Sequence, residues 1–131
     1  MSSVKSSLAP SGVFVHVVEG QALAEEMFAA AFSWHRAPDY KAEIPVLWDI
    51  RDGWLDVSLG ELVGTYGQHI HDANKSRPLG RTAWVVPNPR NTAVLEEIRS
   101  EIAWLSEWKI FRKSQYNEAI DWLSPSIVPI A

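Results

Sequence analysis

Short runs of apolar residues alternate along the chain with segments of helical period. The runs have the length and the β-branched and aromatic composition of strands, and they cover residues 13–18, 45–50, 81–86 and 108–112. The segments that follow them carry apolar side chains three and four residues apart, over residues 21–33, about 58–74, about 91–105 and 114–123. Strands that alternate with helices favour right-handed crossovers. The pattern therefore predicts an α/β fold with a mostly parallel sheet.

Glycines and capping residues indicate where these elements begin and end. Gly20, two residues after the first apolar run, and Arg51, Asp52 and Gly53, after the second, are expected to terminate those strands. Ser58 has a glutamate three residues further on, which is the spacing of a capping box at a helix N-terminus. Asn91 or Thr92 is the expected N-cap of the third helix.

The two ends of the chain are the least regular parts. Residues 1–12 could add an antiparallel edge strand that pairs with residues 13–18 through a turn at residues 10–12, and this would make the sheet four- or five-stranded. Prolines keep residues 124–131 extended as a tail. We expect residues 1–131 to form a single domain.

Composition narrows the classes of function. The chain has 131 residues, of which 47% are hydrophobic and 21% charged, so it is globular rather than disordered. It has no cysteine, which excludes disulfides, thiolate zinc sites and thiol catalysis, and which fits a reducing cytoplasm. The net charge of -4 argues against a general nucleic-acid binder. No apolar stretch approaches the length of a membrane span, and the first residues lack the apolar core of a signal peptide.

Three stretches of the sequence carry a family resemblance. They read VLWDIRDGWLDVS, GRTAWVV and KIFRKSQYNEAIDWL, and the last is the most specific of them. On these stretches the chain, from about residue 13 to residue 123, resembles the SpoIIAA-like proteins, the superfamily of anti-sigma-factor antagonists and STAS domains with lipid-carrier relatives. The resemblance implies a β/α superhelix, with strands largely in sequential order and helices mainly on one face of the sheet.

The same resemblance suggests a phosphorylation site. In the anti-sigma antagonists, an Asp-Ser-Ser-Gly loop leads into the helix after the second predicted strand, and its second serine is phosphorylated. Asp56 and Ser58 match that loop here, whereas Val57 and Leu59 depart from it. A phosphate is favourable at a helix N-terminus, so Ser58 is a candidate phosphoacceptor. The alternative is that Ser58 only caps the helix.

One cluster of metal-ligating residue types is not expected to bind a metal. His69 and His71 lie two residues apart on a predicted helix, where their side chains point about 200° apart and cannot share an ion. His69 and Asp72 could approach each other, but two ligands do not make a zinc site.

Catalytic motifs are equally sparse. The sequence has no nucleophile elbow, no phosphate-binding loop and no dinucleotide fingerprint, so we expect neither an enzyme nor a bound cofactor. Asp49 and Asp52 flank the end of the second predicted strand, where α/β proteins place ligands. A hydrolase that uses these two carboxylates with His35 is the remaining catalytic alternative.

A stripe of small residues lies on the second predicted helix. Gly60, Gly64 and Gly67 share one side of it, and each costs the helix up to about 1 kcal/mol relative to alanine. Either another helix or a ligand approaches this side closely, or the helix is interrupted there.

Tryptophan is abundant, with seven in the chain. Trp48 and Trp84 lie inside the second and third predicted strands. If the helices cover one face of the sheet, these two side chains could form an apolar patch on the other face, which a homodimer contact or a small apolar ligand would cover. The alternative is that they are core residues.

These observations favour a non-enzymatic regulatory or protein-interaction module, as in the STAS relatives. The alternative is a carrier or sensor that binds a small apolar ligand or a lipid.

Overall fold

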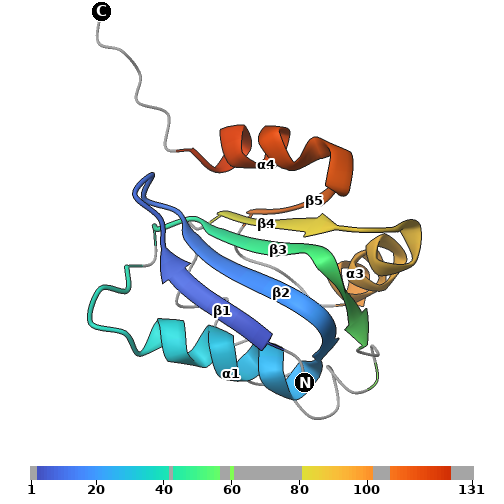
Figure 1. Ribbon diagram of the computed structural model, residues 1–131, viewed down its shortest axis with the longest axis horizontal. Helices are drawn as coiled ribbons and strands as arrows, with labels where there is room; N and C mark the ends of the chain where they lie inside the picture. The colour runs from blue at the N-terminus through green and yellow to red at the C-terminus, as the bar shows by residue number, and fades with distance from the viewer. Residues whose placement is uncertain (1–2, 42, 57–59, 61–80, 102–106, 125–131) are drawn as a thin grey trace, which may run out of the picture.

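The protein consists of three layers, with helices on both sides of one β-sheet (Figure 1). The computed structural model describes residues 3–41, 43–56, 60, 81–101 and 107–124. The predicted α/β class is confirmed. Much of the second predicted helix, at residues 58–74, lies outside the described residues.

Five strands form the sheet. They are β1 (Ser3–Leu8), β2 (Phe14–Leu23), β3 (Val46–Asp56), β4 (Arg81–Val86) and β5 (Glu107–Arg112). They lie side by side in their order along the chain; β1 is antiparallel to β2, and the three other pairs are parallel. The predicted antiparallel edge strand is therefore confirmed. Its hairpin closes through Gly12, whose φ of 88° suits a residue without a Cβ.

The described helices divide between the two faces of the sheet. α1 (Ala24–His35) and α3 (Pro89–Glu101) lie on one face, whereas α4 (Tyr116–Leu123), preceded by the 3-10 turn η1 (Lys113–Gln115), lies on the other (Figure 1). The prediction that the helices lie mainly on one face holds for α1 and α3 and is wrong for α4. The strands between these layers are apolar on both faces of the sheet. Their hydrophobic pattern therefore does not predict which face each helix covers.

Each face of the sheet has its own hydrophobic core. The α1–α3 core is the larger and contains aromatic residues from four strands and α1: Phe14, Trp34, Trp48, Trp84 and Trp108. The α4 core consists mainly of aliphatic side chains: Val13, Leu47, Ala83, Val85, Phe111, Ala119 and Leu123. Ala119 and Leu123 of α4 are buried in it, four residues apart on one side of the helix predicted over residues 114–123.

β2 and β3 both continue beyond the glycines that were expected to end them. The register between the strands shifts between Val17 and Glu19, and Gly20 adopts a φ of 73° that few other residues tolerate. A Cβ on Gly53 would lie 2.6 Å from the Gly20 carbonyl oxygen and 2.9 Å from that of Val18, so the strands can approach this closely only with glycine there. Both glycines thus permit a bulge and a close approach between two paired strands that continue, and the predicted strand ends were wrong.

The first residues of α3 also correct an expectation. Pro89 opens the helix, and the side-chain oxygen of Asn88 accepts a hydrogen bond from the Asn91 backbone N–H at 3.1 Å, as an N-cap does. The predicted cap at Asn91 or Thr92 was therefore wrong. Asn91 is buried instead, and its side-chain oxygen accepts the Leu55 backbone N–H at 2.7 Å. This bond joins the start of α3 to the end of β3.

Candidate functional site

Four aromatic side chains cross the α1–α3 face of the sheet, one from each of β2, β3, β4 and β5. We call them the aromatic row: His16, Trp48, Trp84 and Trp108. The first three occupy matching register positions on neighbouring parallel strands. Neighbouring strands are about 4.8 Å apart, which allows rings in register to stack face to face.

The ring geometry agrees with this register. The centroids of His16 and Trp48 are 4.1 Å apart with an interplanar angle of 21°, and those of Trp48 and Trp84 are 5.2 Å apart at 7°. Trp108 ends the row in an edge-to-face contact with Trp84, at 5.3 Å and 74°. Three of the four rings therefore form a continuous stack.

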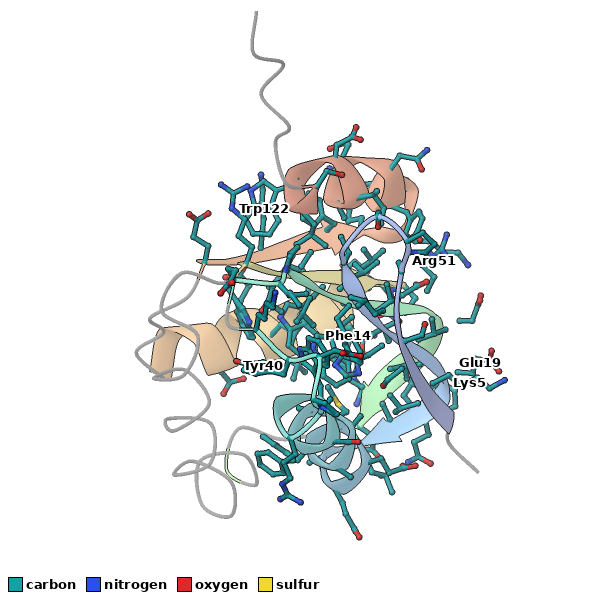
Figure 2. The ribbon with its side chains drawn as sticks, turned by 90° about the vertical axis from the view of Figure 1, so that its left-hand side faces the viewer. Lys5, Phe14, Glu19, Tyr40, Arg51 and Trp122 are labelled. Atoms are coloured by element: carbon teal, nitrogen blue, oxygen red, sulfur yellow. The ribbon has the colours of Figure 1, made fainter. Side chains whose placement is uncertain are left out.

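A second aromatic group links the row to α1. Trp34, near the end of the helix, stacks on Phe14 with centroids 3.8 Å apart and an angle of 8°, and Phe14 meets His16 edge to face. Tyr40, in the segment after α1, packs edge-on against Trp34. In Figure 2, Tyr40 lies on the α1 side of the sheet and Arg51 close to α4.

Two polar atoms within this aromatic core have no hydrogen-bond partner among the described residues. The indole N–H groups of Trp34 and Trp84 are buried, and neither has an acceptor among the residues that the structure describes. A buried donor without an acceptor costs about 1–3 kcal/mol, and proteins seldom retain such groups without a functional or structural reason. These two N–H groups distinguish the α1–α3 core from an ordinary apolar core.

His16 connects the row to the edge of the sheet. Its side chain is 1% exposed, and a hydrogen bond of 2.7 Å joins its Nδ1 to the hydroxyl of Ser6 on β1. Ser6 and His16 are register partners on neighbouring strands, so their side chains lie on the same face of the sheet. The position of the imidazole ring is therefore tied to the edge strand.

The α4 face holds a different polar cluster. Asp49 is buried there, and its two carboxylate oxygens accept hydrogen bonds from Nε and Nη2 of Arg51, each at 2.9 Å. The guanidinium group also lies 3.5 Å from the ring centre of Tyr116 on α4. The side-chain hydrogen bonds to Asp49 raise the pKa of Arg51 above its ordinary value. This cluster is an internally paired structural unit.

The predicted acidic pair does not come together as a catalytic site. Asp49 is buried against Arg51, whereas Asp52 is exposed. His35 is the last residue of α1, on the opposite side of the sheet from the Asp49 carboxylate. The buried His16 is also on that opposite side. The structure thus separates the groups that the hydrolase hypothesis required.

The two predicted tryptophans are placed differently from the expectation. Trp48 and Trp84 are 6% and 8% exposed, so they do not form an exposed patch. They lie on the face that α1 and α3 cover, which corrects the assumption that they face away from the helices. Contact of either indole with a ligand or a partner stays a prediction.

Most of the remaining predicted residues cannot be placed. Ser58, Gly64, Gly67 and the histidine pair at 69 and 71 lie outside the described residues. Gly60 is helical and exposed, and no described atom lies within 4 Å of where its Cβ would be.

Sequence reasoning missed His16 and Trp34 as members of the site. A signal for His16 was present, since His16, Trp48 and Trp84 each occupy the fourth position of a predicted strand. Alignment of the strands in parallel register would have placed the three rings side by side. Trp34 carried no comparable signal, because it lies just beyond the helix predicted over residues 21–33.

Apolar side chains are also exposed beyond the described ends of β1 and β4, where β2 and β3 form a ribbon of two strands among the described residues. In this ribbon, residues 20–23 and 53–56, Trp54 is 50% exposed and Leu23 is 41% exposed. Trp54 pairs in register with Gln21, so it projects from the same side of the ribbon as Leu23. This side is the clearest exposed apolar surface of the described residues.

The described residues contain no group of three or more side chains that could hold a metal ion. None of the described helices combines the length and the apolar character that crossing a bilayer requires.

Comparison of the chain with family models, with curated proteins and with solved structures found no significant match. The resemblance to the SpoIIAA-like proteins therefore rests on the three sequence stretches given above.

Proposed function

We propose that this chain is a binding module of the SpoIIAA-like kind, and that it acts by binding a small, mainly apolar ligand beside the aromatic row. The arrangement of the strands supports the family assignment, because sequential order and consecutive parallel pairs are what a β/α superhelix requires. The proposal puts the alternative of a carrier or sensor ahead of a module that acts only on other proteins.

A single observation carries this choice: the buried N–H groups of Trp34 and Trp84 have no acceptor among the described residues. The surrounding side chains are aromatic and apolar, and they would favour a ligand of the same character. A ligand that supplies an acceptor to either indole would remove the cost of its unpaired donor.

The placement of the ionisable groups supports binding rather than catalysis. The described buried groups capable of proton transfer are His16 and Asp49, and they lie on opposite faces of the sheet. Asp49 is already engaged by Arg51 through two hydrogen bonds. A general acid and a general base that act on one substrate must both reach it.

Native mass spectrometry of the protein purified from its own host tests the proposal. We expect a species heavier than the polypeptide by one small molecule, and loss of that species in Trp84→Phe. Trp122→Phe is the matched control, because Trp122 packs against the α4 core on the other face. A bare polypeptide mass, together with indole N–H resonances that do not respond to an extract of the host's small molecules, would contradict ligand binding.

The exposed apolar side of the ribbon favours a second candidate, a protein-interaction module that forms a homodimer. Trp54 and Leu23 would be buried by such a contact. We expect light scattering to give the mass of a dimer for the native chain and of a monomer for Trp54→Ser. Leu8→Ser is the control, because Leu8 is also exposed but lies at the hairpin end of β1. A native monomer at high concentration would rule out the dimer.

Ser58 remains a proposed phosphoacceptor within the same family assignment. Mass spectrometry of the protein from its own host would detect the phosphate, and its absence under all growth conditions would leave Ser58 as a helix cap.

A further inference from the structure

The stacking of the row determines which part of each ring a ligand can meet. Trp48 lies between His16 on one side and Trp84 on the other, and both contacts are close to face to face. Trp84 has Trp48 stacked against it and Trp108 in edge-to-face contact. The ring faces are therefore engaged with one another, and a ligand beside the row meets ring edges.

Ring edges have a definite electrostatic character. The hydrogens around an aromatic ring are electropositive relative to its faces, and the indole N–H is the most strongly polarised of them. Trp84 presents such a buried N–H within the row, and Trp34 presents a second one within the same core. Both groups require an acceptor atom, and neither can be paired by a hydrocarbon.

The charges of the surrounding residues indicate whether the acceptor atom of a ligand is charged or uncharged. The one Asp, Glu, Lys or Arg side chain that is buried among the described residues is Asp49, and it lies on the α4 face. A carboxylate ligand on the α1–α3 face would therefore find no described buried lysine or arginine to offset its desolvation. An uncharged oxygen has a much smaller desolvation cost.

We infer that the ligand is an uncharged, mainly apolar molecule with a carbonyl or ether oxygen that accepts a hydrogen bond from the Trp84 indole N–H. This inference rests on the proposed function, because it names the chemical class of ligand for the same site. Fully hydrocarbon ligands and carboxylates are the classes that this site disfavours.

Three probes of the same two-ring shape separate these classes. They are 2-acetylnaphthalene, which carries a carbonyl, 2-ethylnaphthalene, which carries no acceptor, and 2-naphthoate, which carries a charge. Each is titrated into the full-length ¹⁵N-labelled protein, and the indole N–H resonances report binding. We expect the ketone to bind about three- to tenfold more tightly than the ethyl compound and to shift the Trp84 resonance downfield. The naphthoate should bind most weakly.

Variants identify the donor. In Trp84→Phe the advantage of the ketone over the ethyl compound should fall to about onefold, while Trp122→Phe should retain it. If Trp84→Phe does not fold, the downfield shift in the native protein decides, because it is caused by the ketone and not by the ethyl compound.

The outcomes distinguish a failure of this inference from a failure of the proposed ligand-binding function. Equal binding of ketone and ethyl compound would leave a ligand-binding module and overturn the hydrogen bond to Trp84. Tightest binding of the naphthoate would overturn the uncharged class. Failure of all three probes to bind would count against both proposals.

Discussion

On the α4 face of the sheet, the buried carboxylate of Asp49 has both oxygens hydrogen-bonded to Arg51, whose guanidinium group lies on the ring of Tyr116. On the α1–α3 face, the indole N–H groups of Trp34 and Trp84 are buried with no acceptor among the described residues. The first face pairs its buried carboxylate within the chain, whereas the second leaves two buried donors without an acceptor among the described residues. The difference is the basis for the proposal that the α1–α3 face binds a ligand, whereas the paired cluster on the α4 face stabilises the fold.

The close approach of β2 and β3 at Gly20 and Gly53 lies within the sheet that both faces share, and disturbing it should have the largest effect. Gly53→Ala places a Cβ 2.6 Å from the Gly20 carbonyl oxygen, and backbone atoms cannot move aside as a flexible side chain can. We expect the free energy of unfolding to fall by about 3 kcal/mol in urea denaturation.

Gly60→Ala is the matched control for that substitution. Gly60 is helical and exposed, with no described atom near the position of a Cβ, so alanine should stabilise the protein by up to about 1 kcal/mol. If the two alanine variants had equal stability, the close approach at Gly53 would be wrong.

The pairing on the α4 face is tested by Arg51→Met. The substitution leaves the buried Asp49 carboxylate without its two charged hydrogen bonds. We expect a loss of about 2–3 kcal/mol by urea denaturation, below the range for fully buried pairs because the Arg51 side chain is 34% exposed.

The control for this variant is Arg90→Met, which changes an exposed arginine of α3 and should alter stability by less than about 0.5 kcal/mol. Equal losses in the two variants would show that the Asp49–Arg51 pair contributes no more than an ordinary surface charge.

Removing the unpaired indole N–H of Trp84 should partly offset the stability that is lost when the smaller ring packs less well on the α1–α3 face. Trp84→Phe removes ring area but also removes the N–H that lacks a described acceptor, so we expect a net loss below about 1 kcal/mol. Trp48→Phe removes a similar area from a ring stacked on both sides and should cost about 2 kcal/mol. Calorimetry of the two ligand-free variants measures the contrast, and the reverse order would contradict it.

The smallest expected effect is that of alkaline pH on the α4 pair. The folded-state pKa of Arg51 is raised, and a base with a raised pKa contributes stability that is lost only as pH rises through that value. This point lies in strongly alkaline solution. The stability difference between the native protein and Arg51→Met should therefore stay constant between about pH 7.5 and pH 10 in urea titrations. A decline within that window would place the Arg51 pKa lower than its pairing implies.

Hydrophobic pattern predicted most of the fold. The bounds of β4 matched the prediction, and the edge strand was anticipated from a turn that contains Gly12. The predicted strand ends failed at Gly20 and Gly53, because glycine is typical both of a strand end and of a close approach between paired strands. Only coordinates distinguish the two uses.

The candidate site was less predictable than the fold. The sequence singled out Trp48 and Trp84 but did not determine the face of the sheet on which they lie. Strands that are apolar on both faces show no alternation of buried and exposed positions from which the face could be predicted. The missing acceptors are also a property of three-dimensional packing. No local pattern of residues predicts which buried donors have a hydrogen-bond acceptor.

The sequential order of the strands has a consequence for how the chain can be assembled during translation. Each strand of the sheet pairs with the strand made just before it, so every new strand meets a neighbour that has already left the ribosome. The sheet can therefore grow from β1 towards β5 in the direction of synthesis, without waiting for a later segment to be inserted between earlier ones.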